Sequence, residues 1–186
     1  MRIDAQAARA AMASAERLFS PAEVEEALDR MASEITRRLE KADPLVLVAM
    51  NGGLVPAGLL LPRLEFPLRL DYLHATRYRE RTFGTELQWK RAPEERLEGR
   101  TLLIIDDILD EGHTLQAILE HCRQAGAREV LSAVLVHKIH PRSNGLEADF
   151  TGVKAPDRYL FGYGMDYKGY WRNAPGIYAI DEALLQ

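Results

Sequence analysis

The segment at residues 102–115 constrains the fold of this chain more than any other. It reads Leu-Leu-Ile-Ile-Asp-Asp-Ile-Leu-Asp-Glu-Gly-His-Thr-Leu, so an apolar run of strand length ends in two adjacent carboxylates, Asp106 and Asp107. A tight turn containing Asp110 and a glycine follows, and the next residues have the pattern of a helix. A buried strand that leads through a short turn into a helix is typical of proteins with a parallel sheet.

The rest of the chain alternates between helix and strand patterns. Ser20 is a candidate N-cap, Pro21 suits the first helical position and Glu23 completes a capping box. Apolar residues then recur at helical spacing as far as Leu39. The other expected elements are strands at 45–50, 68–72, 102–105, 130–136, 159–163 and 177–180, and helices at 54–61 and 114–123.

These elements predict an α/β fold in which a mainly parallel sheet is flanked by helices. The length and the even composition predict a single domain over residues 1–186. Residues 77–96 are polar and weakly patterned, so we expect a long loop there. The chain becomes rich in Gly, Pro, Tyr and Asp after Pro141, so we expect a core at about 20–140 and a small C-terminal hood lobe, mainly at about 141–186, beside the carboxyl edge of the sheet.

Composition argues against several classes of function. The net charge is −4, from 24 Lys and Arg against 28 Asp and Glu, whereas a nucleic-acid partner usually requires a basic excess. No apolar run approaches the roughly 20 residues of a membrane span, and the N-terminus lacks a signal-peptide core, so we expect no membrane partner. The single cysteine, Cys122, cannot form an intramolecular disulfide, which favours a cytoplasmic location.

The 102–115 segment also indicates the kind of ligand. Free backbone N–H groups at a helix start bind anions with the help of the helix dipole, and the Thr114 hydroxyl adds a donor. Carboxylates beside such a site suit a ligand that carries hydroxyls as well as a phosphate, such as a ribose 5-phosphate. The simpler alternative is a solvated turn with acidic N-caps, which is common where a strand leads into a helix.

Residues 102–115 resemble the phosphoribosyl-pyrophosphate-binding motif of type I phosphoribosyltransferases. The resemblance covers about residues 44–180 and extends to the hypoxanthine-guanine branch of that family. It implies the family's fold and the transfer of a phosphoribosyl group from phosphoribosyl pyrophosphate (PRPP) to hypoxanthine or guanine, giving IMP or GMP and pyrophosphate, with Mg²⁺ as cofactor. The segments that carry it are Met-Asn-Gly-Gly at 50–53, Arg-Tyr at 77–78, His-Lys-Ile-His-Pro-Arg-Ser at 137–143, Asp-Phe at 149–150, Pro-Asp-Arg-Tyr at 156–159, Gly-Tyr at 162–163, Asp-Tyr at 166–167 and Tyr-Trp-Arg at 170–172.

The resemblance also implies a role for each matching residue. Asp110 would be catalytic and assist deprotonation of the purine N7, and Asp166 would bind Mg²⁺. The PRPP-binding residues would be Asp106, Asp107, Glu111, Gly112, His113, Thr114, Asn51, Gly52 and Arg172, the purine-binding residues would be Lys138, Tyr159, Leu160 and Asp166, and Arg77 and Tyr78 would belong to a lid.

The chemistry of these residue types agrees with such roles. A cationic Lys138 suits the 6-oxygen of hypoxanthine or guanine and opposes the 6-amino group of adenine. An aromatic face such as that of Tyr159 fixes a planar base by stacking, worth roughly 1–3 kcal/mol per base. Taken singly, Lys138 fits an exposed charge and Tyr159 fits a core residue, so the hypothesis depends on their joint spacing with the 102–115 segment.

Three residues depart from the family pattern. Glu111 stands where a hydroxyl residue is usual, and we expect its carboxylate to point away from the phosphate. Asn51 stands where the family often has a cation, and Arg77 adds a cation where a serine is usual, so these two changes either compensate each other or are independent. In the family the peptide bond between Met50 and Asn51 can be cis.

Two other functions within the same fold stay open. One is a xanthine-preferring phosphoribosyltransferase, and the other is a regulator that binds PRPP without catalysis. The presence of Asp110, Lys138, Tyr159 and Asp166 favours an enzyme. The five histidines show no metal-ligand spacing, so we expect no zinc site. The resemblance suggests a homodimer or homotetramer.

Overall fold

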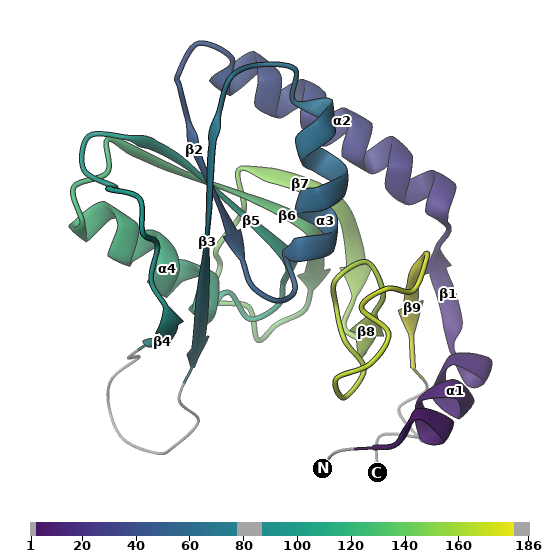
Figure 1. Ribbon diagram of the computed structural model, residues 1–186. Helices are drawn as coiled ribbons and strands as arrows, with labels where there is room; N and C mark the ends of the chain where they lie inside the picture. Colours follow the sequence, from purple (N-terminus) through teal and green to yellow (C-terminus); the bar gives the residue numbers. More distant parts are fainter. Residues whose placement is uncertain (1–2, 78–86, 181–186) are drawn as a thin grey trace.

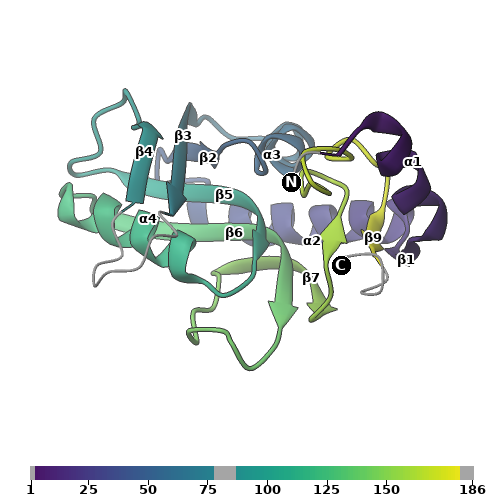
Figure 2. The same ribbon diagram turned by 90° about the horizontal axis from the view of Figure 1, so that it is seen from below.

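The computed structural model describes residues 3–77 and 87–180 and contains two sheets within them (Figure 1). The larger sheet supplies the framework, and the smaller one belongs to a lobe at its side (Figures 1 and 2). The strands are β1 Glu16–Phe19, β2 Leu45–Ala49, β3 Arg69–Arg77, β4 Leu87–Arg91, β5 Thr101–Leu109, β6 Glu129–Ile139, β7 Phe150–Pro156, β8 Leu160–Phe161 and β9 Ile177–Ala179.

The larger sheet has the order β4-β3-β2-β5-β6-β7 among the described residues, and only the edge strand β4 runs antiparallel to its neighbour. The helices are α1 Ala5–Ser14, α2 Pro21–Leu39, α3 Leu54–Leu60 and α4 His113–Gln124, with a 3₁₀ turn at Leu61–Arg63. The side chains of α2 and α3 pack on one face of this sheet and those of α4 on the other (Figure 1). The expected α/β fold with a mainly parallel, doubly covered sheet is confirmed.

Helix α2 begins where the sequence pattern places it. The Ser20 hydroxyl accepts a hydrogen bond from the Glu23 amide, and the Glu23 carboxylate accepts one from the Ser20 amide at 2.8 Å, so the capping box is formed. The apolar face of the helix, from Val24 to Leu39, is buried against the sheet. The helix therefore owes its start to local hydrogen bonds and its position to packing.

The prediction of a loop at 77–96 is wrong in part, because strand β4 lies within this range and pairs with β3. Trp89 of β4 packs on His121 of α4 with 4.5 Å between ring centroids, which anchors this edge strand to the helix layer. The sequence pattern did not predict β4 because most of its residues are polar, as is possible where one face of an edge hairpin is solvated. In β3 the apolar Leu70 and Tyr72 face outward, with 54% and 39% exposure, and Leu73 is the buried residue.

The boundary expected near residue 141, between the core and the C-terminal hood lobe, does not coincide with the division between the two sheets. Strand β7 follows it but completes the larger sheet beside β6. Strand β1 precedes residue 20 but pairs with β9, which also pairs with β8. The indole of Trp171 donates a hydrogen bond to the Ala8 carbonyl of α1 at 2.6 Å. The small lobe is thus built from both ends of the chain. No helix in the described ranges is long and apolar enough to cross a membrane.

Candidate functional site

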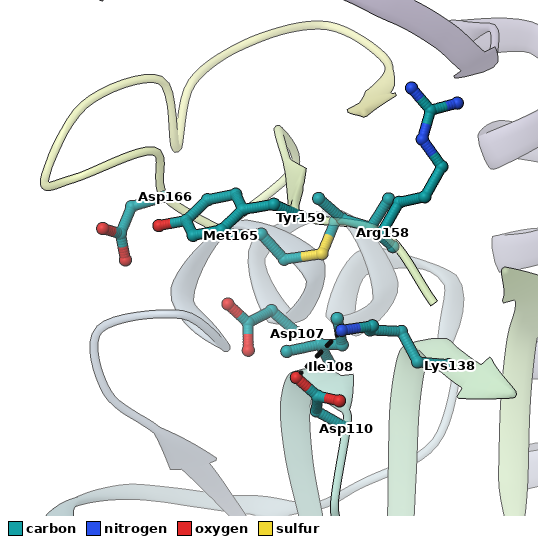
Figure 3. Close-up of a pocket in the computed structure, with 9 residues that line it drawn as sticks. Asp107, Ile108, Asp110, Lys138, Arg158, Tyr159, Met165 and Asp166 are labelled. Atoms are coloured by element: carbon teal, nitrogen blue, oxygen red, sulfur yellow. Dashed lines mark hydrogen bonds and ion pairs between the residues drawn. The ribbon is translucent and has the colours of Figure 1, made fainter. Parts of the chain in front are cut away.

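A pocket lies where the carboxyl ends of β5 and β6 meet the small lobe (Figure 3). This is the edge of a parallel sheet at which α/β proteins bind ligands. Segments that are far apart in the sequence meet here, so the pocket depends on the complete fold. It is lined by Asp107, Ile108, Asp110, Lys138, Arg158, Tyr159, Leu160, Met165 and Asp166.

Two adjacent carboxylates, Asp106 and Asp107, lie near the carboxyl end of β5, and Asp107 lines the pocket. The Asp107 amide donates to Asp106 Oδ1 at 2.9 Å, and Asp107 Oδ2 lies 3.8 Å from Nη1 of Arg172. Burial raises the pKa of Asp106 well above its usual value, and the charge of Asp107 raises it further. Burial also raises the pKa of Asp107, against the opposing effects of Asp106 and Arg172. The pair is therefore costly to ionise until a ligand supplies donors.

We expect Asp106→Asn to stabilise the ligand-free protein. A raised carboxyl pKa in the folded state means that folding takes up a proton, so the stability of the native chain falls as pH rises through the shifted pKa. The variant lacks this loss, so its Tm should exceed the native one; each 1 kcal/mol of added stability raises the Tm by about 2–4 °C in a chain of this size. The excess should grow with pH. Asp149→Asn is the matched control, because Asp149 accepts hydrogen bonds from the Ser132 amide and hydroxyl at 2.8 and 3.0 Å and should lose stability.

The turn after β5 opens directly into α4, which begins at His113. Gly112 is the N-cap with φ of 88°, and no described side chain caps the first turn. The first backbone N–H groups, including that of Thr114, are therefore open to an anion. The Glu111 carbonyl accepts from the Asn144 amide at 3.0 Å, and the half-exposed Glu111 side chain lies 3.7 Å from Nε of Arg142. The Glu111 charge is thus turned toward a cation.

We expect Gly112→Ala to weaken binding of a phosphorylated ligand. A Cβ on this residue would lie 2.2 Å from Oδ1 of Asn144, so either the Asn144 side chain or the turn must shift. The positive φ adds about 1–2 kcal/mol of strain. Gly145→Ala is the matched control, because Gly145 has a φ of 82° and nothing within 4 Å of its Cβ position. Calorimetric titration with PRPP should show weaker binding for Gly112→Ala alone, and equal affinity in the two variants would contradict the assignment.

Asp110 and Lys138 form the polar floor of the pocket (Figure 3). Lys138 is buried, with 7% exposure, and its Nζ lies 3.1 Å from Asp110 Oδ2 and 3.4 Å from Asp157 Oδ1. A buried ammonium requires such partners, since a charge without them is costly. The pair is placed to exchange partners with a ligand that carries both an acceptor and a donor.

Tyr159 and Leu160 form the opposite wall. The Tyr159 ring lies across the pocket from Ile108 (Figure 3), and its hydroxyl accepts from the Lys168 amide at 3.4 Å. An edge contact with Tyr167, at 5.6 Å between centroids, fixes the ring from behind. Burial raises the pKa of Tyr159, so the phenol is neutral at ordinary pH. The space between an aromatic face and an aliphatic side chain suits a flat ligand.

Asp166 and Arg172 form an ion pair at the mouth of the pocket. Asp166 Oδ2 also accepts from the Gly169 amide at 2.7 Å, and Arg172 donates to the Gly164 carbonyl at 2.6 Å. Among the described residues no three or more His, Cys, Asp or Glu are grouped to hold a metal. A cation at Asp166 would therefore take most of its ligands from water and from a bound substrate, as Mg²⁺ commonly does.

The remaining expected residues do not line this pocket. The Met50–Asn51 peptide bond is cis, and Asn51 and Gly52 lie in the turn between β2 and α3. A Cβ on Gly52 would lie 2.1 Å from Oδ2 of Asp107, so this turn packs directly on the paired carboxylates. Arg77 ends β3, and the expected lid from Tyr78 lies outside the described residues as far as position 86.

The matching family model is that of the "Phosphoribosyl transferase domain", over residues 14–168. This range includes every residue that lines the pocket.

The chain belongs to the phosphoribosyltransferase family.

Two named bacterial relatives match this phosphoribosyltransferase over most of their own length. A Bacillus subtilis protein named hypoxanthine-guanine phosphoribosyltransferase is 29% identical over 170 residues, which is 91% of this chain and 94% of that protein. One of the same name from Staphylococcus epidermidis is 32% identical over 162 residues, 86% of this chain and 90% of that protein. The crystal structure of a hypoxanthine phosphoribosyltransferase from Staphylococcus aureus superposes with a TM-score of 0.86 at 25% identity, covering 92% of this chain and 94% of that one.

The structure of this phosphoribosyltransferase adds residues that the sequence did not suggest. Ile108 and Met165 line the pocket, and their apolar character gave no chemical signal. Asp157 contacts Lys138 and stands in the segment that carries the resemblance. His140 stands in the 137–143 segment and lies 2.7 Å from Asp110, but the sequence suggested for it only the role of a metal ligand, for which the histidine spacing does not fit.

Proposed function

We propose that this phosphoribosyltransferase joins hypoxanthine or guanine to the ribose of PRPP and so acts in purine salvage. The observation that carries the proposal is that Lys138 and Asp110 face the Tyr159 ring in one pocket, beside the carboxylates of Asp107 and Asp166 (Figure 3). This set combines a donor for a 6-oxygen, an acceptor for a ring proton and an aromatic surface. The names of the bacterial relatives support the same substrates.

The purine would lie between Tyr159 and Ile108. Lys138 Nζ would turn from Asp110 to the purine 6-oxygen, which provides a charge-assisted bond worth roughly 1.5–3 kcal/mol. Leu160 would meet the edge of the base through its backbone. The Asp110 carboxylate, freed from the ammonium, would accept the proton that the purine loses as its nitrogen attacks the ribose.

The sugar and its phosphate would bind across β5 and α4. Asp106 and Asp107 would accept hydrogen bonds from the ribose hydroxyls, and the backbone from Glu111 to Thr114 would hold the 5-phosphate at the start of α4. Loss of pyrophosphate gives the ribose carbon oxocarbenium character, and nearby negative charge stabilises that state. Arg172, with the turn that contains Asn51 and Gly52, would contact the pyrophosphate.

The residues present fit Mg²⁺ through Asp166. The carboxylate is a hard oxygen ligand on the pocket wall, and the substrate pyrophosphate would supply further oxygens. When bound, the ion would neutralise charge on the departing pyrophosphate. Arg172 would share this task, because its guanidinium lies between Asp166 and Asp107.

The same proposal includes a cytoplasmic homodimer or homotetramer with a PRPP-binding core and a base-binding lobe in one domain. The sole cysteine and the family resemblance support it. Light scattering after size-exclusion chromatography measures the assembly, and a monomer would contradict that part.

Formation of IMP from hypoxanthine and PRPP tests the function. We expect turnover with Mg²⁺ and its loss when EDTA is added, restored by excess Mg²⁺. A native protein that binds PRPP without forming nucleotide would contradict the enzyme and favour a regulator.

A further inference from the structure

His140 lies beside the pocket without entering it. It follows Ile139, the last residue of β6, and its side chain has no exposed surface. It is absent from the residues that line the pocket, so it would not touch a bound base. Any effect of His140 on the reaction must therefore pass through another residue.

That residue is Asp110. His140 Nε2 lies 2.7 Å from Asp110 Oδ1, and both atoms are buried without an aligned hydrogen bond to any described group. Active-site hydrogen bonds are often poorly aligned before the substrate binds and tighten in the complex. Leaving two buried polar atoms unpaired is costly, so a small rotation of either side chain that aligns this 2.7 Å contact would be favourable.

The other ring nitrogen fixes the position of the histidine proton. His140 Nδ1 accepts a hydrogen bond from the Arg142 amide at 3.1 Å. A nitrogen that accepts a hydrogen bond carries no proton, so the proton of the neutral ring is on Nε2, the nitrogen that lies 2.7 Å from Asp110 Oδ1.

The two carboxylate oxygens of Asp110 thus have different surroundings. Oδ1 is buried against His140, whereas Oδ2 lies 3.1 Å from Lys138 Nζ, and the Asp110 side chain as a whole is 46% exposed. Lys138 can leave Oδ2 for a ligand, but His140 has no exposed surface and stays in place.

We propose that His140 is a positioning residue that holds Oδ1 of Asp110 and thereby reserves Oδ2 for the substrate proton. This rests on the proposed function. Without His140 the carboxylate can rotate about its terminal bond, and the acceptor oxygen is no longer fixed relative to the base. Misplacement of a reacting group by about 1 Å can cost 10²-fold in rate.

Substitutions of His140 distinguish a role in positioning Asp110 from a role in packing alone. We expect His140→Leu to lower kcat with hypoxanthine by up to about 100-fold, the loss that misplacement of a reacting group by about 1 Å can cause, with little change in KM for PRPP. His140→Gln can place an amide N–H near the Nε2 position and should restore most of the lost turnover. Ile139→Ala, at the 53% exposed neighbour, controls for disturbance of the strand end and should keep native kcat.

A double-mutant cycle tests whether the effect passes through Asp110. In the Asp110→Asn background, His140→Leu should change kcat by about 2-fold or less, whereas independent effects would multiply. The proposal would be overturned if the kcat losses of the two single variants multiply in the double variant, or if His140→Leu and His140→Gln lose kcat equally. Native kcat in His140→Leu, or a comparable loss of kcat in Ile139→Ala, would also overturn it.

The tautomer can be measured without any turnover. Nitrogen-15 NMR of the native protein should show the proton of His140 on Nε2, and a proton on Nδ1 would overturn the proposal. Absence of IMP formation by the native protein would instead refute the proposed function and leave this measurement interpretable.

Discussion

Asp110→Asn should lower kcat for IMP formation by about 10²–10⁴-fold, the range for loss of general base assistance. The amide preserves the shape of the side chain and can still accept a hydrogen bond, but it cannot take a proton from the purine. PRPP affinity should change little, because the proposed phosphate contacts come from the backbone at the start of α4. Steady-state kinetics and calorimetric titration with PRPP measure the two effects separately.

From the sequence alone, the competing explanation for Asp110 is a helix cap, although the structure has Gly112 as the N-cap of α4 without a side-chain hydrogen bond. Asn caps a helix almost as well as Asp, so this explanation predicts that Asp110→Asn keeps near-native turnover. Asp43→Asn is the matched control, since Asp43 is exposed and precedes β2 at the amino end of the sheet, away from the pocket. Native activity in both variants would remove Asp110 from the mechanism.

Lys138→Met should lower kcat/KM for hypoxanthine by about 10–150-fold, which corresponds to a charge-assisted hydrogen bond of 1.5–3 kcal/mol. Methionine has a similar length but no charge, so the purine 6-oxygen loses its donor. The ammonium is also the shared partner of Asp110 and Asp157, at 3.1 and 3.4 Å. Some loss of thermal stability should accompany the kinetic effect.

The base preference of Lys138→Met shows whether Lys138 recognises the purine or only stabilises the folded protein. If Lys138 opposes the 6-amino group of adenine, the ratio of hypoxanthine to adenine turnover should fall in Lys138→Met. Lys154→Met, at an exposed lysine of β7, should change neither turnover nor the ratio. An unchanged ratio in Lys138→Met would show that the lysine does not select the base.

Local signals predicted much of this fold. The Ser20 capping box, the apolar face of α2 and the runs of β2, β5 and β6 each depend on a few neighbouring residues, so the sequence shows them directly. The pairing of β1 with β9 joins residues about 160 positions apart, and no local pattern reports it. Strand β4 was missed because its stability comes from pairing with β3 and from Trp89 on α4.

The same distinction holds at the pocket. The motif spacing predicted Asp110, Lys138 and Tyr159 as site residues, and in the structure all three line one pocket. Which Asp110 oxygen faces Lys138 and which faces His140 is a matter of side-chain packing at the ends of two strands. Sequence spacing carries no information at that scale.

Comparison of four bases tests most directly whether this protein is a transferase for 6-oxopurines. Purified protein with PRPP and Mg²⁺ is assayed with hypoxanthine, guanine, xanthine and adenine at equal concentrations. Lys138 and Tyr159 predict IMP or GMP as the main products and little AMP. Faster turnover of xanthine would replace the substrate but keep the class of enzyme. Turnover of adenine equal to that of hypoxanthine, or no nucleotide from any base, would contradict the account.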